Sequence, residues 1–381
     1  MNIKQRSQKW IPVAMLVLIS LACSTITATT PQSVSTSDPR QVEPTKPIES
    51  TKPVESTNTP EPSPTPTPAP IGLSRNNPIP RSELVSAPNW DVQILEVKRG
   101  EDAWQDVQAA NMFNEAAPEG KEYFLVKIYV KSTYADSEEH SISSCDFAIT
   151  GDKLINYTCG MANVVAPDPQ LDARLFANGE AEGWAAYLIS QGESNLILVF
   201  DETFNFEDST TRYIAIDDGA SVSIPPDLTS IKSTNAGKER ITPASREDKA
   251  ITEDWEFSIK EVVRGDDALK KVQEANQFNE LPADGFEYIA VKIQVRYISV
   301  EDKAANIDKY FFKTTGSENV LYDAPSVVDP NPSLNASLYP GGEYEGWVVL
   351  QVARLETGII LVFEPLFDFS GNNRRFISLE P

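Results

Sequence analysis

The chain has little histidine, cysteine or positive charge. Its 381 residues include one histidine, three cysteines and 33 lysines and arginines, against 56 aspartates and glutamates. A zinc site needs several His or Cys ligands at suitable spacing, and the sequence contains no such set. The net charge of -23 leaves no basic surface large enough to neutralise phosphates, so we expect no nucleic-acid partner. We also expect no cofactor, and we interpret the acidic surface as one that keeps the protein soluble.

The single histidine has no catalytic context. His140 lies in a polar stretch, residues 136–144, and neither Ser141 nor Ser143 has the sequence of a nucleophile elbow. We interpret His140 as an exposed loop residue, and no serine hydrolase is predicted.

The chain opens with a short basic and apolar segment. Three basic residues precede an apolar stretch, residues 10–22, that is too short to span a bilayer comfortably, and Ala22 stands before Cys23. The segment resembles the lipobox of bacterial lipoprotein signal peptides, although Ser20 takes the place usually held by leucine. The resemblance implies a signal peptide over residues 1–22, a lipid on Cys23, and a membrane-anchored protein on the extracellular face of the cytoplasmic membrane or at the cell surface. An uncleaved N-terminal anchor is the alternative.

Residues 23–70 form the next segment, which holds the expected lipidated cysteine and is rich in Thr, Pro and Ser. It has almost nothing apolar to bury, so it cannot offset the conformational entropy that folding removes. We predict a disordered tether with polyproline character that holds the rest of the chain away from the membrane.

The remainder of the chain contains two diverged copies of one sequence. For example, residues 110–115, ANMFNE, match residues 275–280, ANQFNE. We therefore predict an organisation with two tandem domains. Their bounds are residues 71–217 for domain 1, 218–236 for a linker and 237–381 for domain 2.

Hydrophobic periodicity predicts strands in both copies. Val126, Ile128 and Val130 alternate with polar residues, as in a strand with one buried face, whereas residues 196–200 and 359–363 are apolar throughout, as in a central strand. Seven or eight such strands in each copy predict an all-β fold, with two tandem antiparallel β-sandwiches.

One segment in each copy departs from this pattern. Ala103, Val107 and Ala110 lie at i, i+4 and i+7, which predicts a short helix after the first strand. Phe113 follows the helix, and its counterpart is Phe278. We expect these two phenylalanines to cap the sandwich core.

Four motifs suggest a family. They are residues 72–80, GLSRNNPIP, the Asn-x-Phe-Asn segment, residues 120–123, GKEY, and residues 180–184, EAEGW. Together they resemble a telokin-like, immunoglobulin-like domain of unknown function found in bacterial surface lipoproteins. The second copy keeps only Gly237 and Pro243 of the opening motif. The resemblance implies extracellular immunoglobulin-like sandwiches with no established activity or ligand.

Two cysteines fall within the first copy. If residues 151–153 form a three-residue hairpin loop, Cys145 and Cys159 face each other across two strands at a separation that suits a disulfide. We predict this disulfide, which would stabilise the fold by about 3 kcal/mol in the chain-entropy model. The second copy has Tyr310 and Ala324 at these places.

Carboxylates are the only abundant group that could carry catalysis. Glu180 and Glu182, repeated as Glu343 and Glu345, would point the same way from a strand at a separation compatible with glycoside hydrolysis. We interpret them as solvated acids. Calcium is a weaker alternative, because oxygen ligands suffice for it. The candidate clusters are Asp201, Glu202, Asn205 and Asp208 in the first copy, and Glu364, Asp368 and Asn372 in the second.

The tryptophans are expected to serve the core. Trp90 and Trp255 match, as do Trp184 and Trp347, and a strand tryptophan is usually buried. Trp104 matches a leucine, so the fold does not require an aromatic ring there.

These features predict a non-enzymatic extracellular lipoprotein that presents tandem immunoglobulin-like binding or spacer domains to a protein or glycan at the cell surface. A purely structural envelope protein and a carboxylate-based hydrolase are the alternatives. Residues 132–144 differ in charge pattern from their counterpart, residues 297–309, and the first copy has about two extra residues around positions 159–162. We therefore expect any specificity to lie in these loops.

Overall fold

The computed structural model describes residues 70–202, 210–365, 368 and 370–380. The predicted signal peptide, the lipidation site Cys23 and the tether up to residue 69 lie outside the described residues. The chain divides into two units, residues 1–65 and 66–381, and every described element belongs to the second. Within the described part of the chain, no helix has the length and apolar character needed to cross a membrane.

The first copy begins with a four-stranded antiparallel sheet in the order β1-β2-β3-β8. Its strands are β1 (Val85–Ser86), β2 (Trp90–Arg99), β3 (Lys121–Ser132) and β8 (Glu180–Ser190). Between Ile94 and Glu96 the pairing of β2 with β3 shifts by one residue, which marks a bulge. The alternation predicted for Val126, Ile128 and Val130 places all three in the core.

A second antiparallel sheet, in the order β10-β9-β5-β6, completes the sandwich. Its strands are β5 (Phe147–Thr150), β6 (Tyr157–Thr158), β9 (Ile197–Phe200) and β10 (Arg212–Ala215). The strands β4 (His140–Ser143) and β7 (Asp172–Leu175) pair separately. Strand β9 is buried along its whole length, as expected of an apolar central strand. The core between the sheets includes Trp90, Ile94, Phe124, Ile128, Phe147, Ile149, Tyr187, Leu198 and Phe200.

The second copy repeats most of this arrangement, although no strand among its described residues corresponds to β6. The sheet β11-β12-β13-β17 consists of β11 (Ala250–Ile251), β12 (Trp255–Arg264), β13 (Phe286–Tyr297) and β17 (Glu343–Ala353). Its bulge lies between Ile259 and Glu261, the position that matches the bulge of the first copy. The other strands are β14 (Ala305–Asp308), β15 (Phe312–Thr315), β16 (Asn335–Leu338), β18 (Ile360–Phe363) and β19 (Arg375–Ser378). The second sheet of this copy has the order β15-β18-β19. The fold is thus all-β and antiparallel, as predicted.

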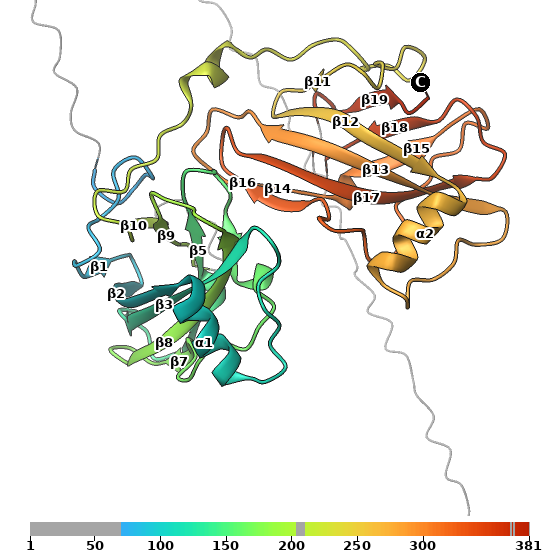
Figure 1. Ribbon diagram of the computed structural model, residues 1–381. Helices are drawn as coiled ribbons and strands as arrows, with labels where there is room; N and C mark the ends of the chain where they lie inside the picture. The colour runs from blue at the N-terminus through green and yellow to red at the C-terminus, as the bar shows by residue number, and fades with distance from the viewer. Residues whose placement is uncertain (1–69, 203–209, 366–367, 369, 381) are drawn as a thin grey trace, which may run out of the picture. The chain divides into compact units, whose positions relative to one another are not determined.

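One helix follows the long first strand of each copy. Helix α1 (Gly100–Ala110) lies against β2 and β3, and α2 (Asp266–Ala275) lies against β12 and β13 (Figure 1). Ala103 and Val107 are fully buried against the outer face of the sheet, whereas Ala110 is exposed. The helix therefore covers one end of the outer face and leaves the other end to polar side chains.

The glycine of the Glu-x-Glu-Gly-Trp motif has a steric role. A Cβ atom on Gly183 would lie 2.4 Å from the backbone nitrogen of Leu171, and one on Gly346 would lie 2.5 Å from that of Leu334. At this point the segment before β7 lies against β8 through a backbone bridge from Gln170 to Trp184. The segment before β16 lies against β17 in the same way, through a bridge from Ser333 to Trp347. Only glycine permits so close an approach, so the motif belongs to the scaffold.

Candidate functional site

The predicted carboxylate pairs are engaged in ion pairs across the sheet. Glu180 Oε1 lies 2.9 Å from Lys131 Nζ, and Glu182 Oε1 lies 2.6 Å from Lys127 Nζ. The hydrogen bond from Lys131 lowers the pKa of Glu180 from its ordinary value. A general acid needs a raised pKa, so this arrangement gives Glu180 no support as an acid catalyst. In the second copy Glu345 pairs with Lys292 at 2.5 Å.

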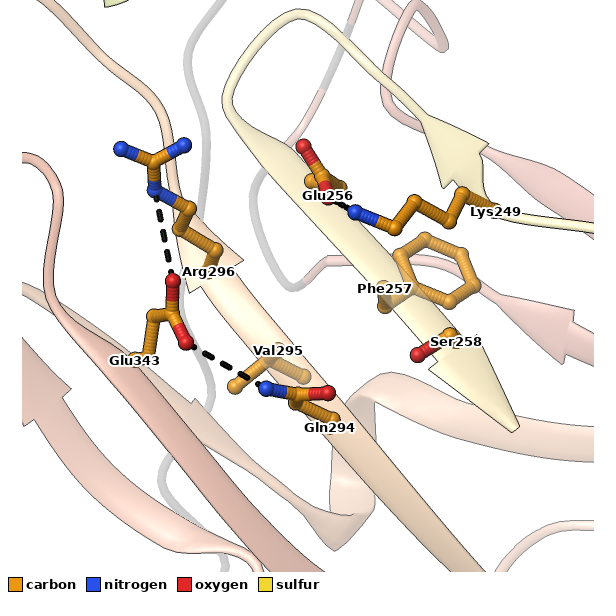
Figure 2. Close-up of a pocket in the computed structure, with 8 residues that line it drawn as sticks. All are labelled: Lys249, Glu256, Phe257, Ser258, Gln294, Val295, Arg296 and Glu343. Atoms are coloured by element: carbon orange, nitrogen blue, oxygen red, sulfur yellow. Dashed lines mark hydrogen bonds and ion pairs between the residues drawn. The ribbon is translucent and has the colours of Figure 1, made fainter. Parts of the chain in front are cut away.

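A small hollow lies on the corresponding outer face in the second copy. Figure 2 shows Lys249 beside Glu256, and Glu343 between Arg296 and Gln294. The pairs are 2.5 Å for Lys249 with Glu256 and 3.3 Å for Gln294 with Glu343. The hollow has a volume of about 50 Å³, against about 300 Å³ or more for ordinary ligand pockets. The hollow is therefore much smaller than an ordinary ligand pocket.

The paired tryptophans are buried, as predicted. Trp90 and Trp255 are 1% and 3% exposed and lie in the core between the sheets. Trp184 and Trp347 lie under the helices instead. Trp104 stacks on Tyr123 with ring centroids 5.8 Å apart. The four paired tryptophans are therefore buried, whereas Trp104 is only partly buried.

A cluster of polar and aromatic side chains forms at the start of β4 in the first copy. The ring of Tyr134 stacks on His140 with centroids 3.4 Å apart, and His140 Nε2 lies 2.9 Å from Asp136 Oδ1. We expected an exposed loop histidine, and this was wrong: His140 begins a strand, and its side chain is 24% exposed. The reason is the aromatic stack, which covers one face of the imidazole.

Glu202 anchors this cluster to the core. Its carboxylate accepts hydrogen bonds from the hydroxyl of Tyr134, from Trp90 Nε1 at 3.1 Å and from Asn89 Nδ2 at 3.1 Å. Burial raises the pKa of the Tyr134 phenol, and the hydrogen bond to Glu202 raises it further. We name Tyr134, Asp136, His140 and Glu202 the β4 cluster. At these places the second copy has Ser299, Glu301, Ala305 and Pro365, so it keeps an acid in place of Asp136 but has no counterpart of Tyr134, His140 or Glu202.

The candidate calcium ligands have other partners or lie outside the described residues. Asp201 accepts a hydrogen bond from Thr211 at 3.1 Å, and Asn205 and Asp208 lie outside the described residues. Glu364 pairs with Lys313 at 3.5 Å and with Arg374 at 3.4 Å. The side chain of Asp368 accepts hydrogen bonds from the backbone of Ser370 and Asn373, and the backbone N–H of Asn372 donates to Ser370 Oγ at 3.1 Å. Where the structure describes the chain, no three His, Cys, Asp or Glu residues gather in a way that could hold a metal ion.

The structure places a disulfide between Cys145 and Cys159, whose Cα atoms are 5.1 Å apart. The hairpin register from which we predicted this pair is wrong. Ala148 pairs with Thr158, and the loop between β5 and β6 spans residues 151–156 because Leu154 adopts a left-handed φ of 60°. Each cysteine lies instead in a single 3₁₀ turn, Ser144–Asp146 or Cys159–Met161.

The phenylalanines after the helices do not cap the core. Phe113 and Phe278 are each 82% exposed, so our expectation was wrong. Each helix ends one residue before Asn111 or Asn276, whose extended backbone turns the chain away from the sheet. The side chain that returns to the protein is the asparagine after the phenylalanine, not the aromatic ring.

Sequence reasoning missed a pair of buried carboxylates. Glu193 and Glu356 are 2% and 1% exposed at matching places. Each carboxylate accepts a hydrogen bond from a tyrosine, Tyr157 at 2.7 Å or Tyr322 at 2.8 Å. The sequence did contain a signal, because both copies have a glutamate at this place. An acid that is kept while the two copies diverge is a candidate for a structural role.

Parts of the chain are similar to solved structures, at low identity. The yjhA protein of Bacillus subtilis is 10% identical over 36% of this chain and 99% of its own, with a TM-score of 0.27. The secreted protein MPT63 of Mycobacterium tuberculosis is 9% identical over 36% of this chain and 98% of its own, with a TM-score of 0.26. The predicted lipoprotein ycdA of Bacillus subtilis is 12% identical over 55% of this chain and 72% of its own, with a TM-score of 0.27.

No family model matches the chain, and no curated protein matches it significantly. At the TM-scores above, likeness to solved structures carries no argument about function. The telokin-like resemblance therefore stays a prediction, and the function has to be argued from the chain's own residues.

Proposed function

We propose that this protein is a non-enzymatic, lipid-anchored extracellular protein whose two immunoglobulin-like sandwich domains present a binding surface outside the cell. In this proposal a lipid on Cys23 holds the chain at the membrane, and the tether up to residue 70 sets its reach. The ligand is a protein or a glycan of the cell surface.

The β4 cluster is the observation that carries this proposal. It orders three side chains of residues 132–144, a segment in which the two copies differ in charge pattern. The second copy folds without them, so their ordering serves something other than the scaffold. Variable loops held on a rigid sandwich are the usual place for recognition. The ion-paired state of Glu180 and Glu182, by contrast, gives no support to a hydrolase.

The test compares the wild-type chain with a variant that takes the second copy's residues in this cluster, Tyr134→Ser with His140→Ala. Both full-length chains are expressed in the native host, crosslinked at the cell surface and purified. We expect a neighbour that crosslinks to the wild type and is lost from the variant, while Glu182→Gln, an exposed change on the same copy, retains it. If the wild type and the variant crosslink identically, or if neither has a partner, the chain is a structural element of the envelope instead.

A further inference from the structure

Each copy exposes one phenylalanine on a turn directly after its helix. We name residues 111–114 and 276–279 the two Phe turns, after Phe113 and Phe278, which are both 82% exposed. Each turn is also hydrogen-bonded to an exposed valine, Val165 at 39% or Val328 at 51%, through Asn114 or Asn279. Exposed apolar groups gathered in this way mark interaction sites more often than isolated ones do.

The turn that carries Phe113 is held in one conformation. The backbone N–H of Phe113 donates to Asn111 Oδ1 at 3.0 Å. The side-chain amide of Asn114 donates to the carbonyl of Val107 at 2.7 Å and to that of Val165 at 2.9 Å, and its Oδ1 accepts from the N–H of Val165 at 3.0 Å. Asn114 thereby connects the end of helix α1 to the segment around Val165, which lies 51 residues further along the chain.

The second copy repeats these bonds. Phe278 N–H donates to Asn276 Oδ1 at 3.0 Å, and the Asn279 amide donates to the carbonyls of Val272 at 2.8 Å and Val328 at 2.9 Å. The Asn279 Oδ1 accepts from Val328 N–H at 2.8 Å. The backbone position of both phenylalanines is therefore fixed before any partner arrives, which lowers the entropy cost of binding.

These contacts account for the asparagines of the motif but not for its phenylalanine. The asparagine side chains make the bonds that hold the turn, whereas the ring lies in solvent and costs hydration free energy there. A residue that is kept in both copies without stabilising either has its role outside the chain.

The segment that follows each helix and carries its Phe turn is acidic, and this indicates the partner's chemistry. Residues 111–120 contain Glu115 and Glu119 and no lysine or arginine, and residues 276–285 contain Glu280 and Asp284 and no lysine or arginine. The chain as a whole carries a net charge of -23. An acid-flanked aromatic ring is complementary to an apolar pocket bordered by basic side chains, and it is repelled by an anionic lipid surface.

We propose that Phe113 and Phe278 are two equivalent anchors for a protein partner that offers an apolar pocket bordered by lysine or arginine. This inference rests on the proposed function as a binding protein, and it names a second surface that is separate from the β4 cluster. Two equivalent anchors on one chain bind two copies of the same site.

A random twelve-residue peptide library, selected on the wild-type protein, is the probe. We expect the selected peptides to combine apolar with basic residues and to bind with a stoichiometry of two per chain by calorimetry. Phe113→Ala and Phe278→Ala should each reduce the stoichiometry to one. The double variant should weaken binding about 10-fold or more, as for an interface hot spot.

Two other exposed hydrophobic residues serve as matched controls. Ile241 and Leu355, which are 83% and 93% exposed, lie outside the Phe turns, and their change to alanine should leave both binding events intact. The thermal unfolding of every variant should equal that of the wild type.

Selected peptides that are acidic, or that bind the double variant as tightly as the wild type, overturn the inference. Phe-dependent binding to vesicles of phosphatidylcholine and phosphatidylglycerol without such peptides also overturns it, in favour of a lipid surface. If only the inference fails, the loss of a crosslinked neighbour on changing Tyr134 and His140 still supports the proposed function.

Discussion

The hydroxyl of Tyr157 donates a 2.7 Å hydrogen bond to the buried carboxylate of Glu193. The other oxygen of this carboxylate accepts from the backbone N–H of Lys153 at 2.7 Å, so Glu193 holds the whole loop between β5 and β6. Glu356 makes the same two kinds of bond in the second copy, with Tyr322 and with the N–H of Glu318. Each copy therefore contains one buried, hydrogen-bonded carboxylate that holds a loop in place.

Replacement of this carboxylate should destabilise the copy that holds it. In Glu193→Gln the amide brings its own N–H groups to a site where the neighbours are donors, and we expect a loss of about 1–3 kcal/mol in the free energy of unfolding. Urea denaturation measures this loss. Glu182→Gln, at a half-exposed ion pair, is the control and should change the free energy by less than about 0.5 kcal/mol. Equal effects of the two changes would contradict a structural role for Glu193.

The disulfide should stabilise only the first copy. Changing both Cys145 and Cys159 to serine removes a crosslink between residues 14 apart, and the chain-entropy model gives a loss of about 3 kcal/mol. Hydrogen exchange read by mass spectrometry separates the two copies, and we expect faster exchange in residues 71–217 alone. The second copy has Tyr310 and Ala324 at these places and acts as an internal control. Unchanged exchange in the first copy would show that the bridge is dispensable.

Acid should weaken the contact between Glu122 and Arg99. Burial opposes the ionisation of Glu122, but the hydrogen bonds from Arg99 at 2.6 Å and from Gly192 at 2.9 Å outweigh it and lower the pKa of Glu122 below its ordinary 4.5. Because the folded-state pKa is the lower one, this carboxylate stabilises the fold above about pH 4.5, and the contribution is lost as the pH falls through the folded value. Stability measured from pH 7 to pH 2 should fall less steeply in Glu122→Gln than in the wild type. Parallel curves would rule out this contribution.

The β4 cluster should depend on the hydroxyl of Tyr134. In Tyr134→Phe the stack on His140 survives, but Glu202 loses one of its hydrogen-bond donors, and we expect a loss of about 1 kcal/mol. The ring signals of His140 in an NMR spectrum should then shift little, whereas Tyr134→Ser should shift them strongly because the stack is gone. A strong shift in the phenylalanine variant would mean that the hydroxyl, not the ring, orders the histidine.

Much of the scaffold could be predicted because it follows periodicity. The alternation of Val126, Ile128 and Val130, the apolar run at 196–200 and the helical spacing of Ala103 and Val107 each correspond to an observed element. Local patterns of this kind depend on neighbouring residues and not on the rest of the fold.

Other predictions failed where a single turn decided the outcome. The left-handed conformation of Leu154 lengthened a hairpin loop and displaced the register expected for Cys145 and Cys159. The extended backbone of Asn111 turns the chain away from the sheet, which leaves the side chain of Phe113 exposed. A change at one residue redirects every side chain that follows, and no periodic pattern records it.

By itself the sequence determined the all-β class, the duplication, the acidic character and the absence of a conventional metal or nucleophile motif, because these depend on composition and spacing. Only the tertiary structure decided which polar groups meet. It paired Glu180 with Lys131, brought Glu202 to Tyr134 across 68 positions of the chain, and buried Glu193 while it exposed Phe113. The physical reason is that burial and hydrogen bonding are set by strands that pair far apart in sequence, whereas propensity acts only between neighbours.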